Sequence, residues 1–395
     1  MKYNCVFGGG AIRGMCYIGA MQALQEFNVE ISSIAGSSVG SVFASLFALG
    51  YSIDEIKEFF LDFNFNMFRD INISLFESDL SISKGEIFLD WLREKIEKKY
   101  FGENYKKDTK RVRFKDIENN LYILTLDINT NTPFIFSKEN TPDEEIAFAV
   151  RVSAGMPGLM KPVNYGNAIL VDGDLIKSWP AWKVFTDLNT SENRLLEFRL
   201  EGSRENQEIK NPLDYVNSVL STIWYLSTEN IYNLYHENDR YDYVIIDTKD
   251  VIMFDFTLDK NEKEKLIERG YETTKKYFLE TLPQKKKVVL ETYKKLLLNL
   301  NILSNSIKSN NARDSIFVTN EVLSSFIDDS KYIDSSICEY IKNFKESLII
   351  NIKKKFMFNK VIENQKQAEE TVNHIKMLVQ ERIEEINFYI KKYNK

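Results

Sequence analysis

Residues 31–50 have the sequence ISSIAGSSVGSVFASLFALG, the most informative segment of this chain. It places Ser38 at the centre of a G-x-S-x-G pentapeptide that leaves an apolar strand-like segment and opens an apolar helix. Gly36 and Gly40 allow the backbone to turn sharply on both sides of the serine, as a nucleophile elbow requires. The dipole of the following helix lies behind the hydroxyl. The stretch therefore predicts an α/β domain with an exposed serine nucleophile, typical of acyl hydrolases.

The composition predicts a large globular protein. Of its 395 residues 44% are hydrophobic and 28% are charged, which is enough for a sizeable core. No window of eighteen apolar residues occurs, so we expect no transmembrane helix. The N-terminus passes directly into a strand, so we expect no cleaved signal peptide and a cytoplasmic protein, with export by a route lacking a cleavable signal left open. The three cysteines lie far apart without a C-x-x-C, which predicts buried thiols rather than disulfides or a zinc site.

Charge and glycine content divide the chain near Pro283. Residues 283–395 carry 20 Lys and Arg against 14 Asp and Glu, a net +6, whereas residues 1–282 carry 32 against 44, a net −12. Glycine does not occur after Pro283, which predicts helices joined by polar segments near 304–313 and 328–334. The last helix should pack through apolar residues at three-and-four spacing, Val372, Ile375, Val379, Ile386 and Ile390. We therefore expect two domains, 1–282 and a helical, Lys-rich region at 283–395.

Strands and helices alternate in the first 282 residues, which predicts an α/β layered domain. Strands are expected at 3–7, 33–35, 121–128, 134–137, 168–172, 194–199 and 243–246, and helices at 14–27, 39–49, 53–63, 85–100, 144–152, 216–235 and 260–279. The acidic balance of this part gives no indication of nucleic-acid binding.

A glycine-rich loop, Gly8-Gly9-Gly10-Ala11-Ile12-Arg13-Gly14, joins the first strand to the first helix. Its backbone N–H groups lie at a helix N-terminus and can hold an anion. A dinucleotide fingerprint fails because Arg13 occupies the position of its last glycine, and no GK[ST] supports a P-loop. Beside an elbow serine the loop predicts an oxyanion hole, with each donor contributing about 3–4 kcal/mol.

Asp172 ends the apolar strand 168–171 and is followed by Gly173, which places a carboxylate at a strand end. The chain has only two histidines, His236 and His374. His236 would fit the order of a Ser-His-Asp triad, but it lies at the polar end of an expected helix, where a surface histidine is favoured. We therefore expect a carboxylate, Asp172, to serve as the base for Ser38.

These motifs and their order resemble the patatin-like phospholipases. The resemblance rests on GGGAIRG at 8–14, GSSVG at 36–40 and Asp172-Gly173, with further similar segments at 83–86, 125–127, 151–158 and 270–272, and it covers residues 3–282. It departs from the family pattern at Ala11, Asp174 and Ser178, where a glycine, a small residue and an asparagine are usual. If Asp174 lies close to Asp172, like-charge repulsion should raise a carboxyl pKa.

The resemblance implies a layered α/β/α domain with a central, mostly parallel sheet, followed by the α-helical region. It implies phospholipase A chemistry at a phospholipid or membrane surface by a Ser38–Asp172 dyad, peripheral at membranes, without metal or cofactor. The oxyanion hole is assigned to Gly8, Gly9, Gly10, Arg13 and Gly14, with the N–H groups of Gly9 and Gly10 as donors. Arg13 is equally compatible with a structural role.

Other functions remain open at the level of sequence. One is an esterase or thioesterase for soluble acyl groups, and another is a catalytically silent binding protein of the same fold. The C-terminal helices would then recruit a protein activator or partner, form a homo-oligomer, or bind anionic lipid through lysines. Phenylalanines at 59, 60, 63, 65, 68 and 76 would form an acyl-chain channel, a lid or plain core.

Overall fold

The chain forms two compact units in a computed structural model. Unit 1 comprises residues 1–236 and 241–275, and unit 2 comprises residues 237–240 and 276–395. The structure describes residues 2–62, 81–175, 194–202, 239–248, 251–252, 257–328, 332–350, 352–355, 359–362 and 364–393, with five isolated positions between 209 and 222.

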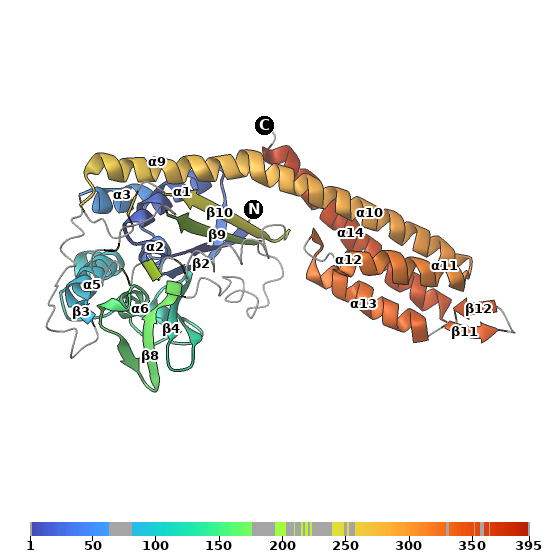
Figure 1. The fold of residues 1–395 in the computed structure, drawn as a ribbon, viewed down its shortest axis with the longest axis horizontal. Coiled ribbons are helices and arrows are strands. Elements are labelled where there is room, and N and C mark those ends of the chain that lie inside the picture. The colour runs from blue at the N-terminus through green and yellow to red at the C-terminus, as the bar shows by residue number, and fades with distance from the viewer. Residues whose placement is uncertain are drawn as a thin grey trace. The chain divides into compact units, whose positions relative to one another are not determined.

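Unit 1 is built on an eight-stranded sheet with the order β10-β9-β1-β2-β4-β8-β7, in which β5 also pairs with β4 (Figure 1). The strands are β1 (Lys2–Phe7), β2 (Glu30–Ser37), β4 (Asn120–Asp127), β5 (Thr132–Ser137), β7 (Val163–Tyr165), β8 (Ala168–Asp172), β9 (Arg194–Glu201) and β10 (Tyr241–Asp247). The run from β10 to β4 is parallel, whereas β5, β8 and β7 pair in the antiparallel sense. The carboxyl ends of β1, β2, β4, β9 and β10 therefore lie along one edge of the sheet.

The helices of unit 1 follow the expected segments closely. They are η1 (Ala11–Met15), α1 (Cys16–Glu26), α2 (Val39–Ala48), α3 (Ile53–Leu61), α5 (Glu86–Phe101), α6 (Ile146–Ser153) and α9 (Lys260–Lys276), with short 3₁₀ turns η3 (Gly102–Asn104), η4 (Phe114–Asp116) and η5 (Gly173–Leu175). A small parallel pair of strands, β3 (Ser81–Ser83) and β6 (Gly158–Met160), was not expected, and neither was β7. The expected helix 216–235 lies almost wholly outside the described residues.

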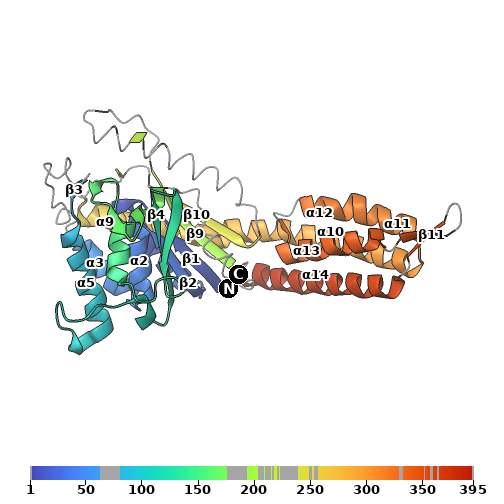
Figure 2. The same cartoon turned by 90° about the horizontal axis from the view of Figure 1, so that it is seen from below.

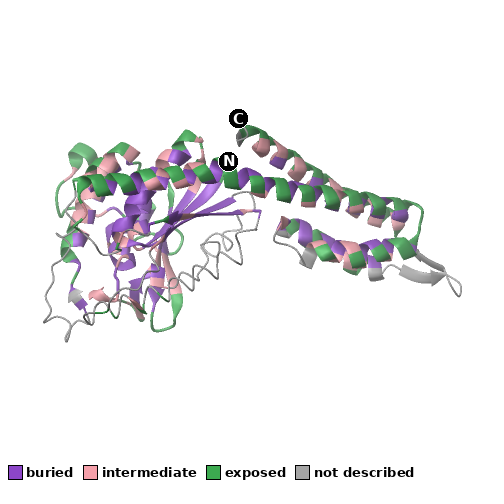
Figure 3. Cartoon of the chain, turned by 45° about the horizontal axis from the view of Figure 1, so that its top comes forward, coloured by how far each residue is buried: buried purple, intermediate pink, exposed green. Residues whose placement is uncertain are grey.

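Alternation along the strands gives the sheet two apolar faces, because successive side chains of a strand point to opposite sides. On one face Phe7 stacks on Phe198, with ring centroids 5.3 Å apart, and meets Tyr17 of α1 and Phe47 of α2. The other face carries a separate buried cluster of Val6, Ala35, Tyr122, Leu195, Tyr241 and Tyr243. The burial of the central strands is visible in purple in Figure 3. Apolar residues on both faces are typical of a sheet enclosed on both sides.

Unit 2 is mainly helical (Figure 2). Its elements are the π-helical η6 (Tyr277–Thr281), α10 (Leu282–Lys308), α11 (Ala312–Phe317), the π-helical η7 (Val318–Leu323), α12 (Ser324–Asp328), α13 (Ser335–Ile350), β11 (Ile352–Lys355), β12 (Asn359–Ile362) and α14 (Gln365–Tyr393). The two polar connections lie where expected, between α10 and α11 and between α12 and α13. The region is α-helical as expected, and the antiparallel pair of β11 and β12 is an addition that the sequence did not predict.

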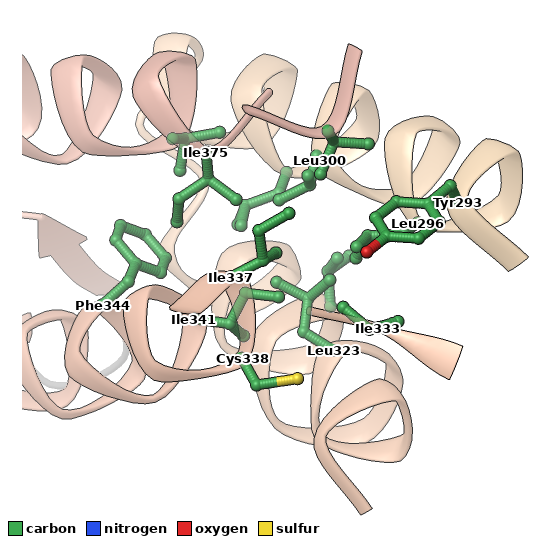
Figure 4. Close-up of a cluster of buried hydrophobic side chains, with 14 of the residues drawn as sticks. Tyr293, Leu296, Leu300, Leu323, Ile333, Ile337, Cys338, Ile341, Phe344 and Ile375 are labelled. Carbon is green, nitrogen blue, oxygen red and sulfur yellow. The ribbon is translucent and has the colours of Figure 1, made fainter. Parts of the chain in front are cut away.

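The core of unit 2 confirms the periodic pattern of its last helix. Val372, Ile375, Val379 and Ile386 of α14 are at most 1% exposed, and Ile390 packs against the same cluster. Figure 4 shows Ile375 together with Leu296 and Leu300 of α10 and with residues of α13.

Ion pairs also connect Asp239 and Arg240 to the helical part of unit 2. Asp239 is 2% exposed and accepts a hydrogen bond of 2.6 Å from Lys286 Nζ and another from Arg382. Arg240 pairs with Asp334. A buried charge is tolerated when it is paired in this way.

Candidate active site

Ser38 lies at the junction of β2 and α2, in a backbone conformation that side chains rarely adopt. Its φ is 52° and its ψ is −131°. Strain of this kind is of order 1–3 kcal/mol and persists where the surrounding structure enforces it. Gly36 and Gly40 enforce the turn, because a β-carbon on Gly36 would overlap the Gly40 carbonyl, and one on Gly40 would overlap the backbone of Phe7 and Gly8. The expected elbow geometry is therefore present.

Ser153 fixes the backbone of the elbow from the neighbouring helix α6. Its hydroxyl accepts a 3.1 Å hydrogen bond from the Ser38 N–H and donates a 2.6 Å bond to the Leu124 carbonyl of β4. Ser153 is fully buried, whereas Ser38 is partly exposed. The Ser38 hydroxyl makes no hydrogen bond to any residue in the described part of the chain. Sequence analysis missed Ser153 as a site residue, since its contacts join three separate elements.

The glycine-rich loop extends β1 toward the elbow. The Gly8 N–H donates to the Phe198 carbonyl over 3.1 Å, and the Gly8 carbonyl accepts from the Tyr17 hydroxyl over 2.7 Å. Gly10 has φ 154°, and Ala11 has φ 48°, a left-handed conformation that favours glycine. The departure at Ala11 therefore leaves a strained residue at the start of η1, with the turn itself retained.

The hydrogen bonds of the loop separate its N–H groups into two kinds. Those of Gly8 and Arg13 are already used, because Gly8 donates to Phe198 and Arg13 donates to the Gly10 carbonyl over 3.1 Å. Those of Gly9 and Gly10 donate to none of the residues that the structure describes. The N–H groups of Gly9 and Gly10 are therefore suited to donate to an acceptor that does not belong to the protein.

The Arg13 side chain supports the loop from behind. Its Nε donates to the Val251 carbonyl over 2.8 Å, and its guanidinium packs against Gly202. Burial lowers the pKa of Arg13 to about 10. These contacts correspond to the structural role that the sequence left open for Arg13.

Asp172 ends β8 on the far side of β4 from Ser38. Thr125 of β4 pairs with Asp172, and the preceding Leu124 pairs with Ser37. Because neighbouring strands lie about 4.8 Å apart, the ends of β2 and β8 are separated by about 10 Å across β4. Asp172 is 1% exposed, and its Oδ1 accepts a 2.8 Å bond from the Asp174 N–H.

Asp174 lies beside Asp172, but its carboxylate is paired with an arginine. Its Oδ1 accepts hydrogen bonds of 2.8 Å from Arg199 Nη1 and of 2.8 Å from Ser37 Oγ. Arg199 also pairs with Glu197, to which Tyr241 donates its hydroxyl. The side chains of this network are all buried, namely those of Ser37, Asp174, Glu197, Arg199 and Tyr241. Burial lowers the pKa of Arg199, but the neighbouring carboxylates of Glu197 and Asp174 raise it by more. The pKa of Arg199 therefore lies well above its ordinary value.

The remaining sequence-based candidates lie apart from this arrangement. His236 falls outside the described residues, and His374 is an exposed residue of α14 whose ring lies 5.2 Å from that of Tyr340. Phe60 is buried against Phe43 and belongs to the core, whereas Phe59 is half-buried and packs against Tyr51. Phe63, Phe65, Phe68, Phe76 and Ser178 lie outside the described residues.

The described residues include no group of three or more His, Cys, Asp and Glu side chains arranged to hold a metal ion. Among the helices that the structure describes, none has the length and apolar composition of a membrane span. Cys5, Cys16 and Cys338 are buried free thiols, as predicted.

The sequence and the structure of this chain are similar to those of several known proteins. An uncharacterized protein of Acanthamoeba polyphaga mimivirus is 29% identical over 294 residues, covering 71% of this chain and 94% of the relative. A probable lipid hydrolase of Invertebrate iridescent virus 6 is 29% identical, over 44% of this chain and 60% of the relative. The crystal structure of VipD from Legionella pneumophila aligns over 95% of this chain and 90% of that one, with 13% identity and a TM-score of 0.44. The model of the patatin-like phospholipases matches residues 5–183, which span the glycine-rich loop, the elbow and Asp172. Over these residues the chain is similar to the patatin-like phospholipase family.

Proposed function

We propose that this protein is a lipid acyl hydrolase of the phospholipase A type, with Ser38 as nucleophile and Asp172 as general base. The observation that carries the proposal is the backbone of Ser38, whose φ of 52° between β2 and α2 is strain of the kind found at functional sites. Similarity to a lipid-hydrolysing family supports the choice of substrate.

The reaction would proceed in two halves. Asp172 accepts the proton of the Ser38 hydroxyl while Oγ attacks the ester carbonyl, and the N–H groups of Gly9 and Gly10 receive the oxyanion of the tetrahedral intermediate. The intermediate collapses to an acyl-Ser38 ester, and the leaving lysophospholipid takes the proton from Asp172. Water then attacks the acyl ester, Asp172 accepts its proton, and collapse releases the fatty acid as the proton returns to Ser38.

Two features support the assignment of the base and of the oxyanion donors. Asp172 lies at the end of the strand that flanks β4 opposite Ser38, and catalytic hydrogen bonds are often formed only in the substrate complex. Gly9 and Gly10 are among the loop residues whose N–H groups have no acceptor among the described residues. The N–H groups of Gly8 and Arg13 already donate within the protein, so these residues shape the loop without donating to the substrate.

The experiment measures fatty-acid release from mixed phosphatidylcholine and phosphatidylglycerol vesicles by the full chain. Ser38→Ala and Asp172→Asn should each lower the rate by about 1,000-fold or more, because each removes a reacting group. Ser45→Ala is the matched control, since it removes a buried hydroxyl of the same helix that donates only to the Val42 carbonyl. His236→Ala should retain the rate.

The same variants distinguish the alternatives. Ser38-dependent cleavage of a soluble 4-nitrophenyl or thiol ester without cleavage of vesicles would favour an esterase or thioesterase. If the folded protein showed no Ser38-dependent cleavage of either substrate, the chain would be a catalytically silent binding protein and the proposal would be wrong. Binding to vesicles, measured by sedimentation, tests the proposed peripheral contact with membranes separately.

We propose further that the helical region acts as a separate unit that recruits an activator or a second copy of the chain. The sequence places its start at Pro283, and the division into compact units places it at Lys276. A chain that ends at Lys275 should keep cleaving a soluble ester at the rate of the full chain if unit 1 is catalytically independent. A change in oligomeric state or loss of stimulation by cell lysate in the shortened chain would assign the recruiting role to the removed helices.

A further inference from the structure

The buried pair of Asp174 and Arg199 contacts three parts of the candidate site, which are the residue before the nucleophile, the glycine-rich loop and Asp172. The Asp174 carboxylate accepts from Ser37 Oγ, the residue before the nucleophile, over 2.8 Å. The Asp174 backbone N–H donates to Asp172 Oδ1 over 2.8 Å. One residue thus holds the elbow through its side chain and the proposed base through its backbone.

The pair also touches the glycine-rich loop. A β-carbon on Gly9 would lie 2.6 Å from Asp174 Oδ2, and one on Gly8 would lie 2.7 Å from Arg199 Nη1, so both side chains pack directly against the loop. Arg199 reaches this place because Phe198 pairs with Phe7, the last residue of β1 before Gly8. Asp174 is 3% exposed and Arg199 is 4% exposed, so both charged side chains are almost completely shielded from solvent.

We propose that Asp174 and Arg199 are positioning residues that hold the nucleophile elbow, the oxyanion loop and Asp172 in one arrangement. The part of this inference that concerns turnover rests on the proposed hydrolase function. Asp174 would act through Ser37, Gly9 and Asp172, because its carboxylate is occupied by Arg199 and Ser37. Reactive geometry is sensitive to such support, since a misplacement of about 1 Å can lower a rate by about 100-fold.

A second buried pair that an arginine of β9 forms, in this case with an aspartate of β10, provides a matched control. Arg194 donates from Nη2 to Asp242 Oδ2 over 3.1 Å, and Tyr3 donates its hydroxyl to the same oxygen over 2.7 Å. Arg194 is 4% exposed and Asp242 is fully buried. Arg194 begins β9 and Asp242 lies near the start of β10, so this pair occupies the amino end of the strands, at the opposite edge from the loop.

The test compares Asp174→Asn with Asp242→Asn in the full chain. Hydrolysis of 4-nitrophenyl butyrate gives kcat and KM, and amide hydrogen exchange followed by mass spectrometry reports on peptides containing residues 8–15 and 36–42. We expect Asp174→Asn to lower kcat about 10- to 100-fold with KM within about twofold, and to speed exchange in both peptides. Asp242→Asn should leave kcat within about twofold and exchange in these two peptides unchanged.

A milder variant keeps the test informative if Asp174→Asn folds poorly. Ser37→Ala removes only the hydrogen bond to Asp174 and should lower kcat by about 3- to 10-fold, with the Arg199 pair intact. Equal effects of Asp174→Asn and Asp242→Asn on both readouts, or no faster exchange in either peptide, would overturn the proposal.

The two readouts separate this inference from the proposed function. A wild-type chain that cleaves no ester would refute the hydrolase proposal, while the exchange comparison would still decide whether Asp174 organises the loop and the elbow. Faster exchange with an unchanged kcat in an active enzyme would refute the positioning role and leave the hydrolase proposal standing.

Discussion

Gly40→Ala tests whether the G-x-S-x-G turn has to be as tight as the structure shows. A β-carbon at this position would lie 2.6 Å from the Gly8 carbonyl oxygen, whereas ordinary van der Waals contact begins at 3.4 Å. The Gly8 carbonyl would have to move by about 0.8 Å and the Phe7 carbonyl, which lies nearer still, by more; Phe7 is the last residue of β1, the strand that leads into the glycine-rich loop. Overpacking of this kind is destabilising by about 1–3 kcal/mol.

The effect on turnover should exceed the effect on stability. A displacement approaching 1 Å between the elbow and the loop should lower kcat by about 100-fold, because the oxyanion donors would no longer face the reacting carbonyl. Gly50→Ala is the control: Gly50 has φ 78° with open space around its α-carbon, so this change should be destabilising by about 1 kcal/mol through backbone strain alone and leave kcat unchanged.

Urea unfolding gives the stability of both variants, and fatty-acid release from vesicles gives their rates. A Gly40→Ala protein that keeps its rate within about twofold would show that the turn need not be so tight. The glycine-rich loop would then tolerate the backbone displacement that a β-carbon at Gly40 requires. A Gly50→Ala protein that loses its rate would show that strain distant from the elbow is sufficient.

Three further predictions concern the rest of the chain. Ser153→Ala should lower the free energy of unfolding by about 1–3 kcal/mol, because it leaves the Ser38 N–H and the Leu124 carbonyl without their buried partner, and urea unfolding that matches Ser45→Ala would contradict this. Leu300→Ala in α10 should be destabilising by about 2–5 kcal/mol because Leu300 is fully buried, whereas Leu298→Ala, at a position 61% exposed, should change stability by less than about 0.5 kcal/mol in the same assay. Iodoacetamide at pH 8 should label none of the three cysteines of the folded protein and all three in urea, since burial raises the pKa of Cys16 to about 12 and that of Cys338 to about 11; mass spectrometry measures the labelling. These thiols stay protonated in the folded protein, whereas the thiols of the unfolded chain lose their protons from about pH 9. The free energy of unfolding should therefore fall as the pH rises from 9 toward 11. An unchanged melting temperature over that range would contradict the raised pKa values of these buried thiols.

The parts of the fold that sequence predicted well are those set by local patterns. β8 and the start of α2 lie at the expected residues, because an apolar run and two glycines define them without help from distant segments. The G-x-S-x-G turn is likewise defined locally, because its two glycines allow the sharp turn of the backbone on both sides of Ser38. The β11–β12 hairpin was missed because a Lys-rich stretch without glycine gives no turn signal.

The site was predicted less completely where its contacts are distant in sequence. The sequence shows that Asp174 departs from the family pattern, and it predicts repulsion between the carboxylates of Asp174 and Asp172 if the two lie close together. In the structure the charge of Asp174 is paired with that of Arg199, a residue of β9. A signal for this pair was present: Glu197 and Arg199 lie on either side of Phe198 in the interior of an expected strand, and buried charges require partners. Which partner each of them takes depends on strand order, and strand order was not contained in the local pattern.

The most direct test of the central claim is to identify the residue that a fluorophosphonate probe modifies in the full chain, by mass spectrometry of its peptides. We expect a single adduct on Ser38, with labelling that is slowed strongly by Asp172→Asn and only slightly by Ser45→Ala. An adduct on another residue, or labelling of Ser38 that Asp172→Asn does not slow, would contradict the Ser38–Asp172 dyad.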